Sequence, residues 1–140
     1  MAITGGCLCG AVRYSSTSKP VLSRTCWCRV CQYIGAGSAT VNVAFNKADV
    51  TVTGELTDYE NVADSGNKMH RKFCPKCGTP MFSEAEVRPN VLVIRSGTLD
   101  NLEEGAPQVT IWTKMAPSWA CISETLPKVE GQPAAPPAPK

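Results

Sequence analysis

At 140 residues the chain is long enough for one domain with a buried core, and its formal net charge of +2 offers no electrostatic basis for nucleic-acid binding. No apolar run approaches the roughly 20 residues that a membrane helix needs, and the N-terminal segment MAITGGCLCG has neither the charged nor the apolar region of a secretory signal. We therefore expect a soluble cytoplasmic protein with no nucleic-acid partner and no membrane partner.

The expected elements are mostly β-strands, because apolar side chains alternate along several short segments. The run from Val91 to Ile94 is continuously apolar, which is typical of a strand covered on both faces. Strands are expected at residues 11–14, 40–45, 49–54, 68–73, 90–97 and 108–113. One short helix is expected at residues 29–34, before the glycine-rich segment GAGSA. The pattern predicts a mainly β fold with few or no long helices.

The end of the chain differs in composition from the rest. The segment LPKVEGQPAAPPAPK, residues 126–140, is rich in Pro and Ala, and its residues 131–140 lack the apolar side chains that anchor a segment to a core. We expect residues 1–130 to form a single zinc-binding domain and residues 131–140 to form a Pro/Ala-rich flexible tail.

Eight cysteines are the most informative feature of the composition. In a reducing compartment such cysteines are metal ligands or catalytic thiols more often than disulfides. Cys121 stands alone, and the other seven form three clusters: Cys7 and Cys9 in GGCLCGAVRY, Cys26, Cys28 and Cys31 in TCWCRVCQ, and Cys74 and Cys77 in KFCPKCGTP.

The first and third clusters suit one structural zinc ion. CPKCG is a C-x-x-C pair followed by Gly78, and CLCG is a C-x-C pair followed by Gly10. Each pair supplies two thiolates, and glycine accepts the positive φ that the turn after such a pair requires. A two-ligand site would be unusual, so we expect Cys7, Cys9, Cys74 and Cys77 to complete each other around one ion.

The central cluster lacks an obvious fourth ligand. His70, the only histidine, and Cys121 are candidates, although an exposed strand residue and a small buried apolar residue are the more common roles of such side chains. The other option is a position left to water or substrate, as in catalytic zinc sites. A three-thiolate site with an open corner favours a soft ligand such as a substrate thiolate, and its exposed zinc is expected to be labile.

Five motifs in this order resemble one family: GGCLCGAVRY, CWCRVC, FCPKCGTPMF, RSGTLD and APSW. The chain resembles the glutathione-dependent formaldehyde-activating enzyme family, which also contains centromere protein V, over about Gly5 to Val129. The resemblance implies several coiled antiparallel β-sheets around a structural zinc held by Cys7, Cys9, Cys74 and Cys77. It implies a second, catalytic zinc held by Cys26, Cys28 and Cys31.

The implied activity is that of a zinc-dependent carbon–sulfur lyase acting on a thiol adduct. The enzyme that names the family joins glutathione and formaldehyde into S-hydroxymethylglutathione, so the implied partner is a small thiol such as glutathione. Two residues depart from the usual C-H-C-x-x-C-R, because Trp27 stands in place of His and Gln32 in place of Arg. Glu84 and Glu86 are the candidates for a general base.

Two alternatives differ in class from the lyase. A non-enzymatic zinc-binding scaffold or interaction module of the same fold would have two filled metal sites and no accessible corner. A redox protein would use the C-x-x-C pair of Cys74 and Cys77 for disulfide exchange.

Overall fold

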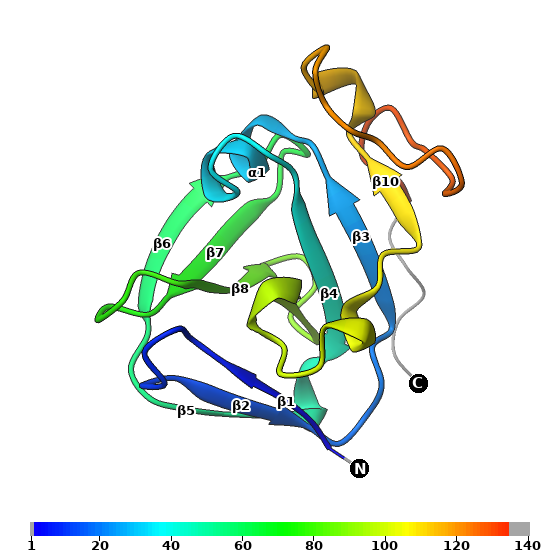
Figure 1. Cartoon of the computed structure of the whole chain (residues 1–140). Helices are drawn as coiled ribbons and strands as arrows, with labels where there is room; N and C mark the ends of the chain where they lie inside the picture. Colours follow the sequence, from blue (N-terminus) through cyan, green and yellow to red (C-terminus); the bar gives the residue numbers. More distant parts are fainter. Residues whose placement is uncertain (1, 135–140) are drawn as a thin grey trace.

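The computed structural model describes residues 2–134 and contains two β-sheets and one short α-helix (Figure 1). The strands are β1 Ile3–Gly6, β2 Arg13–Ser16, β3 Leu22–Cys26, β4 Thr40–Asn46, β5 Val50–Thr53, β6 Thr57–Val62, β7 Lys68–Phe73, β8 Pro80–Ala85, β9 Val91–Arg95 and β10 Val109–Ile111. The α-helix is α1 Arg29–Ile34, and the 3-10 turns are η1 Lys47–Asp49, η2 Ser96–Thr98, η3 Leu102–Gly105 and η4 Thr113–Met115. The prediction of a mainly β fold without long helices is confirmed.

The two sheets differ in size and in the direction of one strand pair. The smaller sheet has the order β1-β2-β5 and is antiparallel. The larger sheet has the order β10-β3-β4-β9-β8-β7-β6, and only its β10–β3 pair is parallel among the described strands. The antiparallel sheets implied by the family resemblance are confirmed, apart from this one parallel pair at the β10 edge. A short hairpin cannot join parallel neighbours, and here all the elements from α1 to η3 lie between β3 and β10 in the chain.

The main core lies between the two sheets. Val43, Phe45 and Ile94 on the larger sheet have no exposed side-chain area, and Val43 pairs with Ile94 in register. Tyr14 of the smaller sheet packs edge-on against Phe82, with 5.6 Å between ring centroids. Burial of these side chains holds the sheets together.

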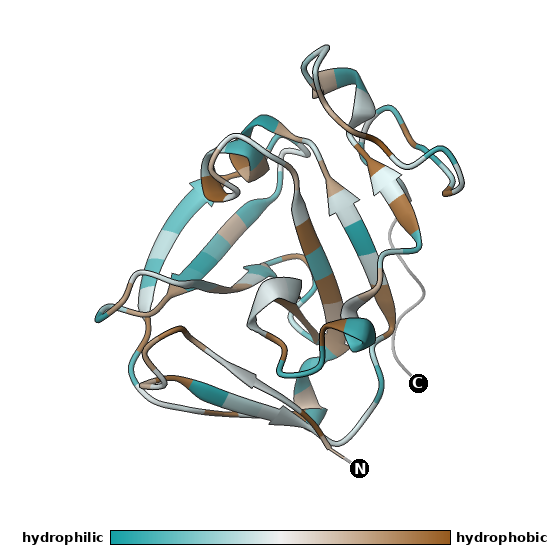
Figure 2. Cartoon of the chain, viewed as in Figure 1, coloured by the Kyte–Doolittle hydropathy of each residue, from teal (hydrophilic) through white to brown (hydrophobic). Residues whose placement is uncertain are grey.

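The opposite face of the larger sheet is far more polar. Side chains alternate between the faces of a strand, so the residues between the core positions point away from the core. On β4, Asn42 and Ala44 alternate with Val43 and Phe45, and bands of differing hydropathy follow along this strand in Figure 2. On β9, Arg95 follows the buried Ile94. This second face positions the site described below.

Six predicted strands and the predicted helix find counterparts in the structure. The ranges 29–34 and 68–73 match α1 and β7, and the range 11–14 begins and ends two residues before β2 does. Four strands were missed: β1, β3, β6 and β8. β1 contains two glycines, β6 is almost wholly exposed at a sheet edge, and β8 begins at Pro80, a position where proline costs no ladder hydrogen bond.

The first residues of the expected tail contact the body of the protein. The Trp112 amide donates to the Gly131 carbonyl at 3.3 Å, and Trp112 Nε1 donates to Gln132 Oε1 at 2.9 Å. Residues 135–140 of the expected tail lie outside the described residues. None of the helices within residues 2–134 has the length and apolar character to cross a bilayer.

Candidate metal centres and the adjoining pocket

The first and third cysteine clusters meet in space. The Sγ atoms of Cys7, Cys9, Cys74 and Cys77 all lie within 4.8 Å of one another. Cys7 Sγ is 3.6 Å from Cys9 Sγ, which is 3.8 Å from Cys74 Sγ. Four sulfurs held about 2.3 Å from a tetrahedral zinc are separated by about 3.8 Å, so the spacing and the donor set fit this ion. We call this group the four-cysteine centre.

Two similar turns present these thiols. Gly10 and Gly78 have φ values of 81° and 76°, and their amides donate to the carbonyls of Cys7 and Cys74 at 3.1 and 2.8 Å. The Val12 amide donates to Cys7 Sγ at 3.2 Å and lowers the pKa of this thiol. Amide donors favour the thiolate, which is the form that binds metal.

The geometry of the C-x-x-C pair does not favour disulfide exchange. Cys74 has no exposed area, whereas an exchanging thiolate must be reached by its partner. Cys77 lies 3.1 Å from the Thr79 hydroxyl, whose hydrogen bond lowers the pKa of Cys77 to about 5. A thiol so readily ionised and adjacent to three others suits a metal ligand.

The central cluster forms a second group, which we call the three-cysteine centre. Cys26 is the last residue of β3, Cys28 is the N-cap of α1, and Cys31 lies within α1; their Sγ atoms also lie within 4.8 Å of one another. Cys28 Sγ accepts the Cys31 amide at 3.3 Å. Hydrogen bonds from Cys26 and Cys28 lower the pKa of Cys31, whereas hydrogen bonds with Cys28 and Cys31 raise the pKa of Cys26. Three soft donors at this spacing also fit zinc.

The three-cysteine centre is less exposed than the sequence suggested. Cys26, Cys28 and Cys31 are 5, 7 and 5% exposed, because Ile111 and Trp112 pack against them. That a metal bound here has an open corner stays a prediction. Access to these thiols is through a pocket, described below, that Cys26 and Cys31 line.

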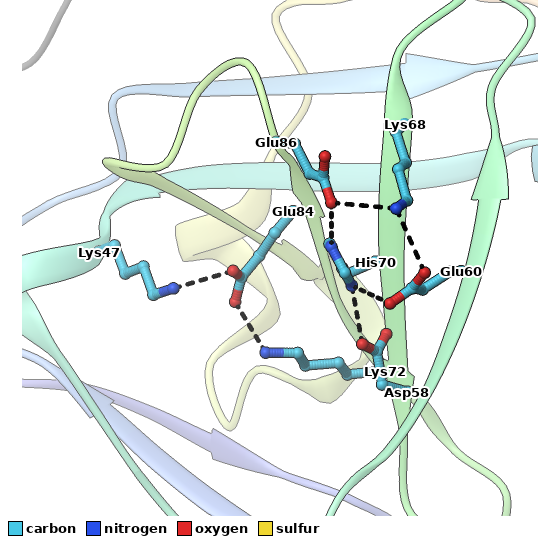
Figure 3. Close-up of polar contacts among 8 residues, drawn as sticks. All are labelled: Lys47, Asp58, Glu60, Lys68, His70, Lys72, Glu84 and Glu86. Atoms are coloured by element: carbon cyan, nitrogen blue, oxygen red, sulfur yellow. Dashed lines mark hydrogen bonds and ion pairs between the residues drawn. The ribbon is translucent and has the colours of Figure 1, made fainter.

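Neither candidate for a fourth protein ligand joins this centre within the described chain. Cys121 is exposed and lies in an irregular segment, so the expectation of a buried apolar residue on a strand was wrong. His70 is a half-buried residue of β7, and its ring contacts Asp58 and Glu86 at 2.8 and 3.0 Å (Figure 3).

The two residues that depart from the family motif have structural contacts. Gln32 is buried, and its Oε1 accepts a hydrogen bond from Arg29 Nη1 at 2.6 Å. Its Nε2 donates to the carbonyls of Trp27 and Met115 at 2.8 and 3.0 Å. Trp27 is 3% exposed and packs edge-on against Trp119. Gln32 therefore ties α1 to the segment after β10, and Trp27 is absent from the described lining of the pocket.

The candidates for a general base belong to a surface charge network. Glu84 contacts Lys47 and Lys72 at 2.9 and 3.2 Å, and Glu86 contacts His70 (Figure 3). Neither glutamate is among the described residues that line the pocket beside the cysteines. The structure thus separates both carboxylates from the three-cysteine centre.

Asp58, Glu60 and His70 also lie close enough to hold an ion (Figure 3). Lys68 lies 3.5 Å from both Glu60 and Glu86, so lysine and histidine already balance these exposed carboxylates. The arrangement is that of a solvated ion-pair network.

A pocket lies on the polar face of the larger sheet, beside the three-cysteine centre. We call it the arginine pocket, because four arginines line it together with Cys26, Cys31, Asn42 and Ser83. The arginines are Arg24, Arg71, Arg88 and Arg95. Sequence reasoning missed all four, although the alternation of Arg24 with Cys26 and the RSGTLD motif were available signals.

Arg95 is the buried cation nearest this chemistry. It is 8% exposed, and burial lowers the pKa of its guanidinium, while the neighbouring Cys31 thiolate favours the charged form. Gln32 of α1 stands where the family usually has arginine, whereas Arg95 of β9 places a positive charge near the Cys31 thiol.

The fold and the two cysteine centres define a β-sheet protein with cysteine clusters that could hold metal ions. The sequence profile of the family described as glutathione-dependent formaldehyde-activating enzyme matches residues 2–115, so the chain belongs to this family. A crystal structure of a Rhodobacter sphaeroides protein is similar in fold, with a TM-score of 0.55 and 22% identity over 70% of this chain and 88% of that chain. No curated protein matches the chain.

Proposed function

We propose that the protein is a zinc-dependent carbon–sulfur lyase that acts on a thiol adduct, with glutathione and formaldehyde as the model pair. The observation that carries this proposal is the three-cysteine centre, which has three thiols within 4.8 Å, no fourth protein ligand among residues 2–134, and a pocket beside it. In this proposal Cys26, Cys28 and Cys31 hold the catalytic zinc. The four-cysteine centre holds a structural zinc.

The chemistry requires a thiol sulfur and a carbonyl carbon to meet in the pocket. When bound, zinc would lower the pKa of a thiol at its open position and favour the thiolate. The sulfur forms a bond to the carbonyl carbon, the π electron pair moves to oxygen, and the proton released by the thiol ends on that oxygen. The reverse sequence cleaves the carbon–sulfur bond. The burial of Cys26 and Cys31 restricts water around the reacting sulfur.

Burial also supports the second candidate, a zinc-binding scaffold without catalytic activity. With Cys26, Cys28 and Cys31 only 5–7% exposed, both centres would serve the fold alone. Either function fits a reducing compartment such as the cytoplasm, where thiols remain available as ligands. The two candidates differ in whether an added thiol reaches the second metal.

Exchange spectroscopy by NMR tests the lyase proposal with glutathione and formaldehyde. We expect the zinc-loaded wild type to accelerate exchange between free glutathione and its hydroxymethyl adduct, and Cys28→Ala to lose this acceleration. In the cobalt-substituted protein, glutathione should change the visible spectrum of wild type and leave that of Cys28→Ala unchanged. No acceleration and no spectral change in wild type would favour the scaffold.

A further inference from the structure

The arginine pocket gathers four positive charges without a balancing carboxylate. Its described lining contains Arg24, Arg71, Arg88 and Arg95 and no Asp or Glu. Within residues 2–134, none of these four guanidinium groups forms an ion pair with a carboxylate, whereas Arg13 pairs with Asp100. Like charges gathered in this way repel one another, so the pocket is suited to an anionic ligand.

Arg95 gives independent evidence for such a ligand. It is 8% exposed and lines the pocket, yet its Nε has no hydrogen-bond partner among the described residues. Its Nη1 donates to Asn42 Oδ1, which fixes the guanidinium in place. An unpaired buried donor costs folding free energy, and the fork of a guanidinium matches a carboxylate in geometry. The free donor is therefore available to a ligand in the pocket.

The strand register places the arginines at two positions. Arg95 pairs across the sheet with Asn42, which pairs with Arg24, two residues from Cys26. Arg88 lies in the turn between β8 and β9, at the end of the sheet opposite to Cys26. Arg71 is level with Val93, through Ser83, and so lies between these two ends. The charges therefore occupy two positions: Arg24 and Arg95 lie on either side of Asn42 near the cysteines, and Arg88 lies at the opposite end of the sheet.

We propose that these four arginines are the specificity-determining residues of the site and select a small thiol with two anionic groups, such as two carboxylates, one at each of the two positions. This inference rests on the proposed function, because Cys26 and Cys31 line the same pocket. Neutral and cationic thiols leave the arginines at both positions without a counter-ion and bind weakly.

Calorimetric titration of the zinc-loaded protein tests the selection without using activity. The probe is S-methylglutathione, which keeps two carboxylates and has no free thiol, and its diethyl ester is the neutralised partner. We expect the acid to bind more tightly than the ester, with an affinity that falls as salt rises. Arg71→Gln and Arg88→Gln should each weaken binding of the acid by about tenfold, the loss expected for one charge-assisted contact.

Arg13→Gln is the matched control, because it removes the same charge outside the pocket and should leave the affinity unchanged. Arg88 makes no side-chain hydrogen bond within residues 2–134, so Arg88→Gln keeps the fold and decides the test if Arg71→Gln unfolds. Cys28→Ala should still bind the acid. Equal binding of acid and ester, or an Arg88→Gln affinity equal to that of Arg13→Gln, overturns the inference even if wild type accelerates the thiol–aldehyde reaction. Charge-selective binding without that acceleration supports the inference and removes the lyase proposal instead.

Discussion

The two cysteine centres should differ in their effect on stability, which Cys74→Ala and Cys28→Ala compare. Cys74 has no exposed area and lies 3.8 Å from Cys9, 65 residues earlier in the chain. A metal held there joins the turn after β1 to the turn between β7 and β8. Cys28 and its fellow ligands come from one six-residue stretch, so their metal closes little of the chain.

The expected magnitudes follow from these positions. A structural zinc supplies about 10–16 kcal/mol, comparable with the total stability of about 5–15 kcal/mol of a domain of this size. If Cys74→Ala removes even about 5 kcal/mol of this, the melting temperature falls by roughly 15 °C, at about 3 °C per kcal/mol. Cys28→Ala removes the N-cap acceptor of the Cys31 amide, which costs about 1 kcal/mol or roughly 3 °C.

The assay is thermal unfolding followed by circular dichroism, with metal content measured on the same samples. Wild type should contain two zinc ions per chain and Cys28→Ala one, with little loss of stability. Slow removal of the zinc from wild type by a chelator, without denaturant, should lower its melting temperature to nearly that of Cys74→Ala. Equal losses of melting temperature in the two variants would refute the division into structural and catalytic centres.

Four further predictions use other features. A chelator should remove one zinc quickly and one slowly from wild type, and only the slow one from Cys28→Ala; one uniform phase would contradict separate roles. Hydrogen bonds that the His70 ring donates to Asp58 and Glu86 raise its pKa, so its contribution to stability is full below about pH 6.5 and falls as pH rises through the folded-state pKa. The melting temperature of His70→Gln should therefore lie further below wild type at pH 5.5 than at pH 8.5, and a constant gap would count against this. Gln32→Leu leaves two carbonyls without their donor and should cost about 2 kcal/mol in a urea titration, whereas a neutral effect would show that water replaces the side chain. A chain ending at Ala134 should have the melting temperature of wild type. A chain ending at Glu130 loses two hydrogen bonds of Trp112 and should therefore lose about 1–2 kcal/mol of stability. Equal melting temperatures of the two shortened chains would show that these bonds contribute nothing.

Local patterns in the sequence were sufficient for the features that depend on neighbouring residues. The helix at 29–34 and the strand at 68–73 were predicted at the observed bounds, because periodicity and breakers act within a few residues. The pairing of CLCG with CPKCG was also predictable, since a two-ligand zinc site is unusual and only a second pair completes it. The same reasoning identified the three-cysteine centre, whose ligands are adjacent in the chain.

Only the tertiary structure decided what surrounds these cysteines. The arginine pocket combines β3, β7, β9 and the turn before β9, and no local pattern states that Arg24, Arg71, Arg88 and Arg95 share one face of a sheet. The exposure of the thiols was likewise set by a distant strand, since Ile111 of β10 packs on the three-cysteine centre through a parallel pairing that the sequence did not suggest. Ligand identity is a property of residue type and spacing, whereas access and charge at a site are sums over every element that packs around it.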